Sequence, residues 1–379
     1  MKTMGILEND EIQDFIDGKD TESFWLHIIS TPDTKILGEE VRRKIQSILD
    51  KWHKSNPKIY KKRKVTLENI ETYEKFKNGE SIPTLTQSVR WKHVYLLSDP
   101  HWDYWKSERS LDDKIAHDKL ILDTAKWNGA RSVNLIQSAM PYARQDKTTP
   151  WKRQSGSFDT IGREFSYFTG SNGYIMNLDL HNPASKSAFQ GTNFINFHTW
   201  WFIKRCIQDM NKEQWNIVLS GADQWWDKKV SGIAKEYWLQ KIIVIKDRDY
   251  SKKNSVNTID IYWDIEWKDI LIHDDILDTW GTLCSLLEEM LKKKPKSINI
   301  AITHWQFNGE AFEKLEKIIK KSEWVIEKVY ITNSINKSNL PEYVEVMHTD
   351  DIIANNIFSI LQWLPIKSCL LYTSPSPRD

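Results

Sequence analysis

The sequence predicts an α/β fold made of two domains, each with a mainly parallel sheet flanked by helices. The chain has 379 residues, and a domain takes roughly 100 to 200 residues, so the length supports two domains. Short apolar runs alternate with helical segments, a pattern typical of parallel sheets covered by helices. The runs form two groups that separate near residues 197–207. Each group is therefore expected to form one sheet.

The expected strands are short and rich in Ile, Val and Leu, as strands buried on both faces are. In the first half they cover residues 93–97, 133–136 and 175–178. In the second half they cover residues 217–219, 242–245, 270–272, 298–302 and 329–331. A helical pattern over residues 352–364 follows the last strand.

Composition and charge exclude several classes of protein. Lys and Arg number 53 and Asp and Glu 52, a net charge of +1, so no overall field attracts nucleic acid or an acidic membrane. The three cysteines show no paired spacing, which argues against a disulfide framework or a thiolate zinc site. The acidic N-terminus is neither a signal nor a transit peptide, and no run reaches the ~18 apolar residues of a membrane span. We expect a cytoplasmic protein that binds neither nucleic acid nor membranes.

Residues 270–283 carry the strongest local signal, a buried strand, then a loop with carboxylates, then a helix. A helix N-terminus presents free N–H groups and the positive end of its dipole to a phosphate. The hydroxyls of Thr279 and Thr282 stand beside it, and Asp274 and Asp275 at the strand end suit sugar hydroxyls. An ordinary helix cap with solvated acids is the alternative, but a cap needs fewer polar residues. The segment therefore predicts a sugar-phosphate site.

The same segment resembles the phosphoribosyl-diphosphate loop of type I phosphoribosyltransferase-like proteins, which has two acids, two apolar residues and Asp-Thr-Gly-Gly-Thr. Further segments resemble motifs of the ribose-phosphate diphosphokinase family, namely Ser-Val-Arg-Trp at residues 88–91, Tyr-Ala-Arg-Gln-Asp at 142–146, Asp-Leu-His at 179–181 and Thr-His-Trp-Gln-Phe-Asn-Gly at 303–309. Residues 75–80 resemble its Arg-Phe-Ser-Asp-Gly-Glu, with Asn78 in place of an acid. The resemblance extends in order from about residue 75 to residue 335.

This resemblance implies two phosphoribosyltransferase-like domains. Residues 25–200 would form the ATP side, and residues 201–345 the side for ribose 5-phosphate and diphosphate. An extension at residues 1–24 precedes them and a C-terminal helix at residues 346–368 follows. Residues 369–379 read CLLYTSPSPRD and resemble translated sequencing-adapter DNA, so no function is assigned to them.

The resemblance also assigns site residues. Ribose 5-phosphate would be bound by Asp274, Asp275, Asp278, Thr279, Trp280, Gly281 and Thr282, and the diphosphate loop would be Asp223, Gln224, Trp225 and Trp226. ATP would be bound by Phe76, Asn78, Glu80, Arg144 and Gln145, and Mg²⁺ by His181 and Asp223. Lys246 and Arg248, on a polar stretch to Asn257 that is expected to be a mobile loop, would neutralise charge in the transition state.

The implied activity is ribose-phosphate diphosphokinase, which transfers diphosphate from ATP to ribose 5-phosphate and releases AMP. Family members form oligomers, commonly hexamers, with the ATP site completed across subunits, so a homo-oligomer is expected. A catalytically inactive regulatory paralogue is the alternative, favoured if the indoles of Trp225 and Trp226 fill the diphosphate loop. A simple phosphoribosyltransferase fits less well, because it would lack the first domain.

Tryptophan outnumbers glycine, 19 to 14, although glycine makes up about 7% of an average chain. This inversion suggests that one codon, most simply UGA, has been translated as tryptophan where the source reads glycine. Eight tryptophans stand where a turn or a family motif favours glycine: Trp91, Trp225, Trp226, Trp238, Trp263, Trp267, Trp280 and Trp305. Trp324 has no such support. We expect the eight positions to be glycine in the functional protein.

Overall fold

The computed structural model describes residues 26–55, 57, 63–71, 74–101, 109–148, 151–222, 224–248, 256–262, 264–277, 281–306, 311–336 and 340–361. Only the backbone is described for residues 224–229, 245–248, 256–260, 262, 281–282 and 311–312. The predicted extension at residues 1–24 and the tail at residues 369–379 lie outside this part of the chain. Two compact units divide the chain, unit 1 with Met1–His198 and Thr349–Asp379, and unit 2 with Thr199–His348.

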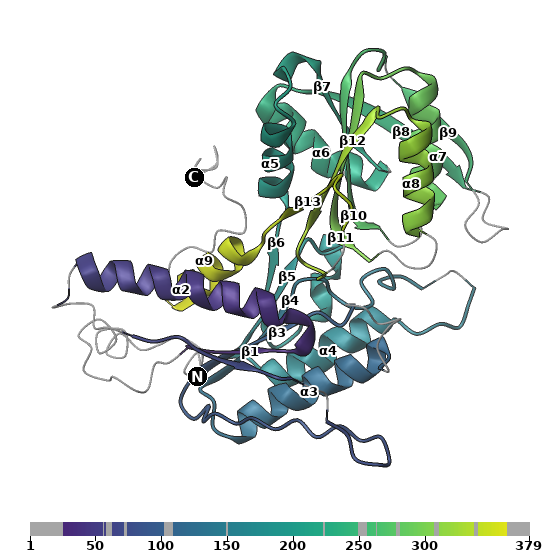
Figure 1. Cartoon of the computed structure of the whole chain (residues 1–379). Helices are drawn as coiled ribbons and strands as arrows, with labels where there is room; N and C mark the ends of the chain where they lie inside the picture. The colour runs from purple at the N-terminus through teal and green to yellow at the C-terminus, as the bar shows by residue number, and fades with distance from the viewer. Residues whose placement is uncertain are drawn as a thin grey trace, which may run out of the picture. The chain divides into compact units, whose positions relative to one another are not determined.

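Unit 1 contains a six-stranded sheet in the order β2-β1-β3-β4-β5-β6 (Figure 1). All of its neighbouring strands pair in parallel. The strands are β1 (Leu26–Ser30), β2 (Thr66–Asn69), β3 (His93–Ser98), β4 (Ser132–Gln137), β5 (Tyr174–Leu178) and β6 (Asn193–Phe197). The helices are η1 (Pro32–Thr34), α2 (Lys35–Ser55), α3 (Leu111–Trp127), α4 (Ser157–Thr169), η2 (Pro183–Ala188) and α9 (Asp350–Leu361).

Helices cover both faces of this sheet. One face packs on α2 and α9, where Val41, Ile45 and Ile357 meet Ile28 and Tyr95 in one buried cluster. The helices α2 and α9 lie side by side although they come from opposite ends of the chain (Figure 1). The helices α3 and α4 contact strands β3, β4 and β5 and each other. This double cover explains why the strands are apolar on both faces.

Unit 2 contains a seven-stranded sheet in the order β13-β12-β11-β10-β7-β8-β9. Only β8 and β9 pair antiparallel among its described neighbours. The strands are β7 (Ile217–Gly221), β8 (Gln240–Arg248), β9 (Val256–Tyr262), β10 (Asp269–Leu277), β11 (Ser297–Trp305), β12 (Ile326–Thr332) and β13 (Val344–Met347). The helices are α5 (Trp200–Met210), η3 (Gln214–Asn216), α6 (Gln224–Tyr237), α7 (Gly281–Lys292) and α8 (Ala311–Lys321).

Alternate side chains of the unit 2 strands enter two separate cores. Ile270, Ile272 and Ile300 pack with α7 and α8, whereas Leu271 and Ala301 pack with α5 and α6. All nine residues of β11 are buried, as expected for a central strand covered on both sides. The predicted α/β class with mainly parallel sheets is confirmed, and each of the eight predicted strands is present. Strands β1, β2, β6, β9 and β13 are additional.

Among the described residues, none of the helices combines the length and the apolar character that a membrane crossing requires.

Candidate functional site

The predicted phosphate loops of unit 2 follow two neighbouring strands. β7 and β10 pair in parallel, with Ser220 opposite Ile272 and Gly221 opposite His273. From β7 the chain continues to β8 on one side, and from β10 it continues to β11 on the other side. Strand order therefore reverses between β7 and β10. In open α/β sheets, ligands bind outside the carboxyl ends of the strands at such a reversal.

Helix N-termini face this edge of the sheet. α6 begins at Gln224, soon after β7 ends at Gly221, and α7 begins at Gly281, soon after β10 ends at Leu277. The first N–H groups of each helix lack partners within the helix, and the dipole there favours an anion. Asp223, Asp278, Thr279 and Trp280 lie outside the described residues. For Gln224, Trp225, Trp226, Gly281 and Thr282 the structure describes the backbone alone.

Asp274 and Asp275 lie within β10, so the prediction that they belong to a loop is wrong. β10 extends to Leu277 because β11 continues beside it, pairing Asp274 with Ile302 and Ile276 with His304. Successive side chains of a strand point to opposite faces, and here Asp275 is buried while Asp274 is half-buried. The two acids therefore face different sides of the sheet, which leaves Asp274 the more accessible of the two.

Lys246 and Arg248 lie in β8, so the prediction that residues 246–248 belong to a loop is also wrong. β9 pairs antiparallel with this part of β8, placing Lys246 opposite Ile259 and Arg248 opposite Val256. Because β8 is parallel to β7, its end lies at the same edge as the two phosphate loops. The side chains of Lys246 and Arg248, and residues 249–255, lie outside the described part.

In unit 1, a side-chain hydrogen bond joins the loops that follow β4 and β5. Asn182 Nδ2 donates to Asp146 Oδ2 at 2.6 Å. Asp146 directly follows the predicted ATP-binding residues Arg144 and Gln145, which are exposed, and Asn182 directly follows half-buried His181. The structure thus brings these two predicted segments together at the carboxyl edge of the sheet.

Phe76, Asn78 and Glu80 form the tip of a hairpin in unit 1. Phe76 N–H donates to the Glu80 carbonyl at 2.8 Å, and Gly79 N–H donates to the Phe76 carbonyl at 2.9 Å. The Asn78 side chain accepts from Glu80 N–H at 3.2 Å. Gly79 has a φ of 93°, a backbone conformation that residues other than glycine rarely adopt. The Phe76 ring is 57% exposed and is therefore free to stack on a ligand.

A buried polar cluster at the carboxyl edge of unit 1 was not predicted. Lys114 Nζ lies 3.5 Å from Asp33 Oδ2, and both side chains are buried. Asp118 accepts hydrogen bonds from Ser98 Oγ at 2.5 Å and Gln137 Nε2 at 3.2 Å. Burial raises the pKa of the Asp118 carboxyl to about 7. The cluster combines residues of η1, α3 and the ends of β3 and β4, and the strand order of this sheet reverses between β1 and β3.

A signal for this cluster was present in the helix pattern. Lys114, His117 and Asp118 recur at helical spacing on the face of α3 that also carries Ile121 and Leu122. Three ionisable residues on a buried face are uncommon unless they are paired. Burial, together with the nearby charge of Arg109, lowers the pKa of His117 to about 4, so its imidazole is neutral at pH 7.

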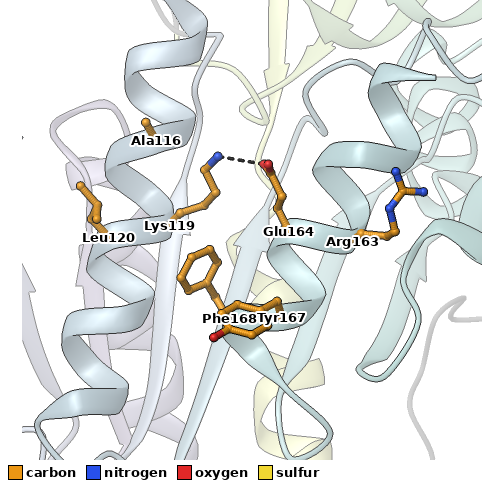
Figure 2. A pocket seen from close by; sticks show the side chains of 7 residues that line it. All are labelled: Ala116, Lys119, Leu120, Arg163, Glu164, Tyr167 and Phe168. Carbon is orange, nitrogen blue, oxygen red and sulfur yellow. Dashed lines mark hydrogen bonds and ion pairs between the residues drawn. The ribbon is translucent and has the colours of Figure 1, made fainter. Parts of the chain in front are cut away.

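A hollow of about 550 Å³ lies between α3 and α4 (Figure 2). Its walls are Ala116, Lys119, Leu120, Arg163, Glu164, Tyr167 and Phe168. Figure 2 shows Lys119 reaching from α3 to Glu164 on α4, with Nζ 2.8 Å from Oε2. None of the predicted site residues lines this hollow, so it is not assigned to the predicted chemistry.

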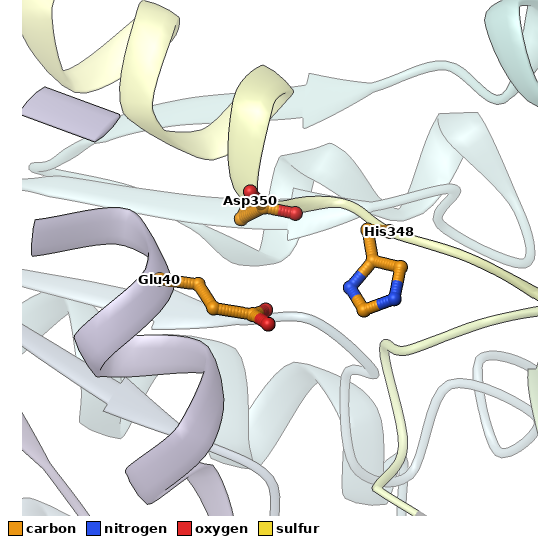
Figure 3. Close-up of side chains that lie close together, drawn as sticks. All are labelled: Glu40, His348 and Asp350. Atoms are coloured by element: carbon orange, nitrogen blue, oxygen red, sulfur yellow. The ribbon is translucent and has the colours of Figure 1, made fainter. Parts of the chain in front are cut away.

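Glu40, His348 and Asp350 offer ligand atoms that lie within 4.8 Å of one another (Figure 3). Asp350 is in the first turn of α9, where an acid is favoured by the helix dipole. Lys44 Nζ lies 3.7 Å from Asp350 Oδ2 and 2.9 Å from Asp351 Oδ1. A helix dipole and a lysine therefore account for Asp350 without a metal ion.

Comparison with known proteins gives a consistent set of relatives. Residues 27–161 match the N-terminal domain of ribose phosphate pyrophosphokinase. A ribose-phosphate pyrophosphokinase of Mycoplasma pneumoniae is 24% identical over 296 residues, 78% of this chain and 84% of the relative. Ribose-phosphate pyrophosphokinase 4 of Saccharomyces cerevisiae is 25% identical over 260 residues, 68% of this chain and 75% of the relative.

The fold is also that of a solved structure. The crystal structure of phosphoribosylpyrophosphate synthetase from Mycobacterium smegmatis matches with a TM-score of 0.71 and 19% identity. The match covers 89% of this chain and 99% of that chain. The similarity therefore extends over both units and not over the first domain alone.

Proposed function

We propose that this chain is a member of the ribose-phosphate pyrophosphokinase family and transfers diphosphate from ATP to ribose 5-phosphate. One observation supports this proposal most strongly. The two segments that resemble phosphate loops, distant in sequence, follow adjacent parallel strands at the point where the strand order of unit 2 reverses. A sugar phosphate and a diphosphate could then occupy one edge of the same sheet.

In the proposed reaction, the 1-hydroxyl oxygen of ribose 5-phosphate attacks the β-phosphorus of ATP. The bond from that phosphorus to the oxygen bridging the α-phosphate breaks, the hydroxyl proton leaves, and AMP departs. The backbone N–H groups at the starts of α6 and α7 would hold diphosphate and sugar phosphate. Half-buried Asp274, in β10, would bind the ribose hydroxyls, whereas Asp275 is buried on the other side of the sheet. Lys246 and Arg248 would balance the charge that develops on the transferred group.

ATP would be held by residues of unit 1. The exposed Phe76 ring would stack on the adenine, and the exposed Arg144 guanidinium would pair with phosphate oxygens. Gln145, Asn78 and Glu80 would supply further polar contacts. The hydrogen bond between Asn182 and Asp146 supports this assignment, because it fixes the loop that carries Arg144.

Mg²⁺ is part of the proposal. This ion takes oxygen ligands, commonly one or two carboxylates together with substrate phosphates. In β10, half-buried Asp274 directly follows His273, and His273 lies opposite Gly221 at the end of β7. Asp223 comes two residues after Gly221 in the sequence. The resemblance assigns this ion to Asp223 and His181, and Asp274 offers a further carboxylate next to the end of β7. The ion, when bound, would neutralise the triphosphate of ATP. We also propose a cytoplasmic homo-oligomer, a hexamer by resemblance to the family.

The test is release of AMP from ATP, with and without ribose 5-phosphate, in Mg²⁺. Two forms ending at Ser368 are compared, the chain as printed and the chain with the eight tryptophans predicted to be glycine replaced by glycine. AMP release that requires ribose 5-phosphate in the glycine form supports the proposal. A folded glycine form that releases no AMP would favour a regulatory, inactive paralogue instead.

Single substitutions test which residues bind each substrate. Arg144→Ala should raise KM for ATP, since a phosphate contact is lost, and Asp274→Asn should raise KM for ribose 5-phosphate. Lys119→Gln serves as the matched control, because Lys119 lines the hollow between α3 and α4 and takes no part in the proposed site. Equal effects of all three substitutions would contradict the assignment.

A further inference from the structure

Exposed tryptophans of this chain have an unusual backbone conformation. Seven exposed tryptophans occur among the described residues, at positions 91, 127, 151, 215, 238, 267 and 324. Five of them, Trp91, Trp151, Trp238, Trp267 and Trp324, have a φ between 55° and 72°. These five make up half of the ten non-glycine residues with positive φ in the described chain. A bulky side chain is rare in this region, because its Cβ crowds the backbone.

Trp238 occupies a helix-ending position that normally holds glycine. α6 ends at Tyr237, Trp238 N–H donates to the Lys235 carbonyl at 3.4 Å, and Leu239 N–H donates to the Ala234 carbonyl at 2.8 Å. These two bonds are the pair that defines a Schellman motif, with Trp238 at its left-handed residue. Leu239 and Ala234 belong to the same buried cluster, as the motif favours. The Trp238 indole is 90% exposed and adds no packing there.

Trp91 and Trp267 each occupy the third residue of a tight turn. Lys92 N–H donates to the Val89 carbonyl at 3.0 Å, and Lys268 N–H donates to the Ile265 carbonyl at 3.2 Å. In each turn only the third residue has a positive φ, 64° at Trp91 and 58° at Trp267. This is the arrangement of a type II turn, which favours glycine at that residue.

Trp324 lies in a turn where both central residues have positive φ. Val325 N–H donates to the Ser322 carbonyl at 3.0 Å, with φ of 50° at Glu323 and 72° at Trp324. Two central residues of positive φ are typical of a type I′ turn, in which the second is most often glycine. The structure thus adds Trp324, and also Trp151 with a φ of 67°, to the positions the sequence pattern had indicated.

Other tryptophans do not share this conformation. Trp127 is exposed at the end of α3 and Trp215 is exposed in η3, and neither has a positive φ. Trp305 is fully buried in the core of unit 2 and also lacks a positive φ. Trp52 packs edge-on against Phe358, with ring centroids 4.9 Å apart. The left-handed conformation therefore separates a subset of the tryptophans from the rest.

We infer that residues 91, 151, 238, 267 and 324 are glycine in the protein that its source makes. A codon that is read here as tryptophan would be decoded as glycine at these positions. The inference depends on backbone conformation, turn hydrogen bonds and composition, and it is independent of the proposed activity. At these positions the backbone has the positive φ that favours glycine, although the sequence has tryptophan there.

Unfolding measurements on single variants test the inference. Each of the five Trp→Gly substitutions relieves left-handed strain but adds chain entropy to the unfolded state. Strain relief should prevail, raising the ratio of folded to unfolded protein by roughly two- to tenfold at each position. Trp127→Gly and Trp215→Gly are matched controls, exposed tryptophans with ordinary φ. The controls should gain nothing, and Trp127→Gly should lose about twofold, because glycine is the poorer helix former.

A gain at the five positions and none at the controls supports the inference. Similar changes in stability for the five variants and the two controls, or a loss of stability in the five variants, would overturn the inference. Mass spectrometry of peptides from the protein purified from its source gives an independent result even if the printed chain does not fold. Glycine masses at residues 91, 238 and 324 support the inference, and tryptophan masses there contradict it.

Discussion

Replacing Asp118 by Asn should change how stability depends on pH. Asp118 is fully buried beside Ser98 and Gln137, and burial raises the pKa of its carboxyl from 3.8 to about 7. The buried charges of Asp33 and Lys114 face the same cluster and partly offset each other in their effect on this carboxyl. An Asn side chain keeps the acceptor oxygen for both hydrogen bonds but cannot ionise. The variant therefore removes one titration while leaving the local packing in place.

The size of the change in stability follows from the difference between the pKa of Asp118 in the folded protein and in the unfolded chain. Between pH 3.8 and about 7 the folded protein holds a proton that the unfolded chain releases, so Asp118 makes stability fall as pH rises. A shift of about three pKa units corresponds to on the order of 4 kcal/mol. His117 has the opposite effect on the pH dependence of stability, because folding lowers its pKa from 6.5 to about 4. Its contribution makes stability rise between pH 4 and 6.5, by about 3 kcal/mol.

The two contributions nearly cancel between pH 4 and 6.5 in the unsubstituted chain. Urea unfolding of Asp118→Asn at several pH values should therefore show stability rising by about 3 kcal/mol across that window. At pH 8 the variant should be the more stable of the two, by up to about 4 kcal/mol, since no buried charge remains at residue 118. Parallel pH curves for the two proteins, or a less stable variant at pH 8, would refute the reasoning.

Two further substitutions test local packing and capping, with urea unfolding as the measurement for both. Gly162→Ala should cost about 1 to 3 kcal/mol, because the added Cβ would lie 2.7 Å from Ala188 Cβ; a neutral result would mean that η2 moves away freely. Ser110→Ala should cost about 1 kcal/mol, since Ser110 Oγ accepts from Asp113 N–H at 3.1 Å in the capping box that begins α3. Thr124→Ala, within the same helix and half-buried, should cost less than Ser110→Ala, and the reverse order would contradict the capping role.

The strands of the two cores could be predicted because their residues are apolar on both faces. Strands β3, β10 and β11 contain such apolar runs. The strands that sequence reasoning missed carry polar residues or lie at a sheet edge. β6 has asparagines at positions 193 and 196, and β2 and β13 are four-residue edge strands. A pattern search for continuous apolar runs passes over such strands.

The site residues show where local pattern and tertiary context differ. Asp274 and Lys246 look like loop residues because they are charged and follow apolar runs. Both continue a strand, because β11 and β9 extend beside them and supply ladder hydrogen bonds. The bond between Asn182 and Asp146 joins residues 36 apart in sequence, and no local pattern predicts it. The left-handed φ at Trp324 likewise depends on a turn that composition alone does not reveal.

The most direct test of the proposed activity is the dependence of AMP release on ribose 5-phosphate. The glycine form of the chain, supplied with ATP and Mg²⁺, should release AMP only when ribose 5-phosphate is present. The second product should then carry the diphosphate on the 1-oxygen of the sugar, which phosphorus NMR can identify. AMP release at the same rate without ribose 5-phosphate, or none from a folded protein, would contradict the account.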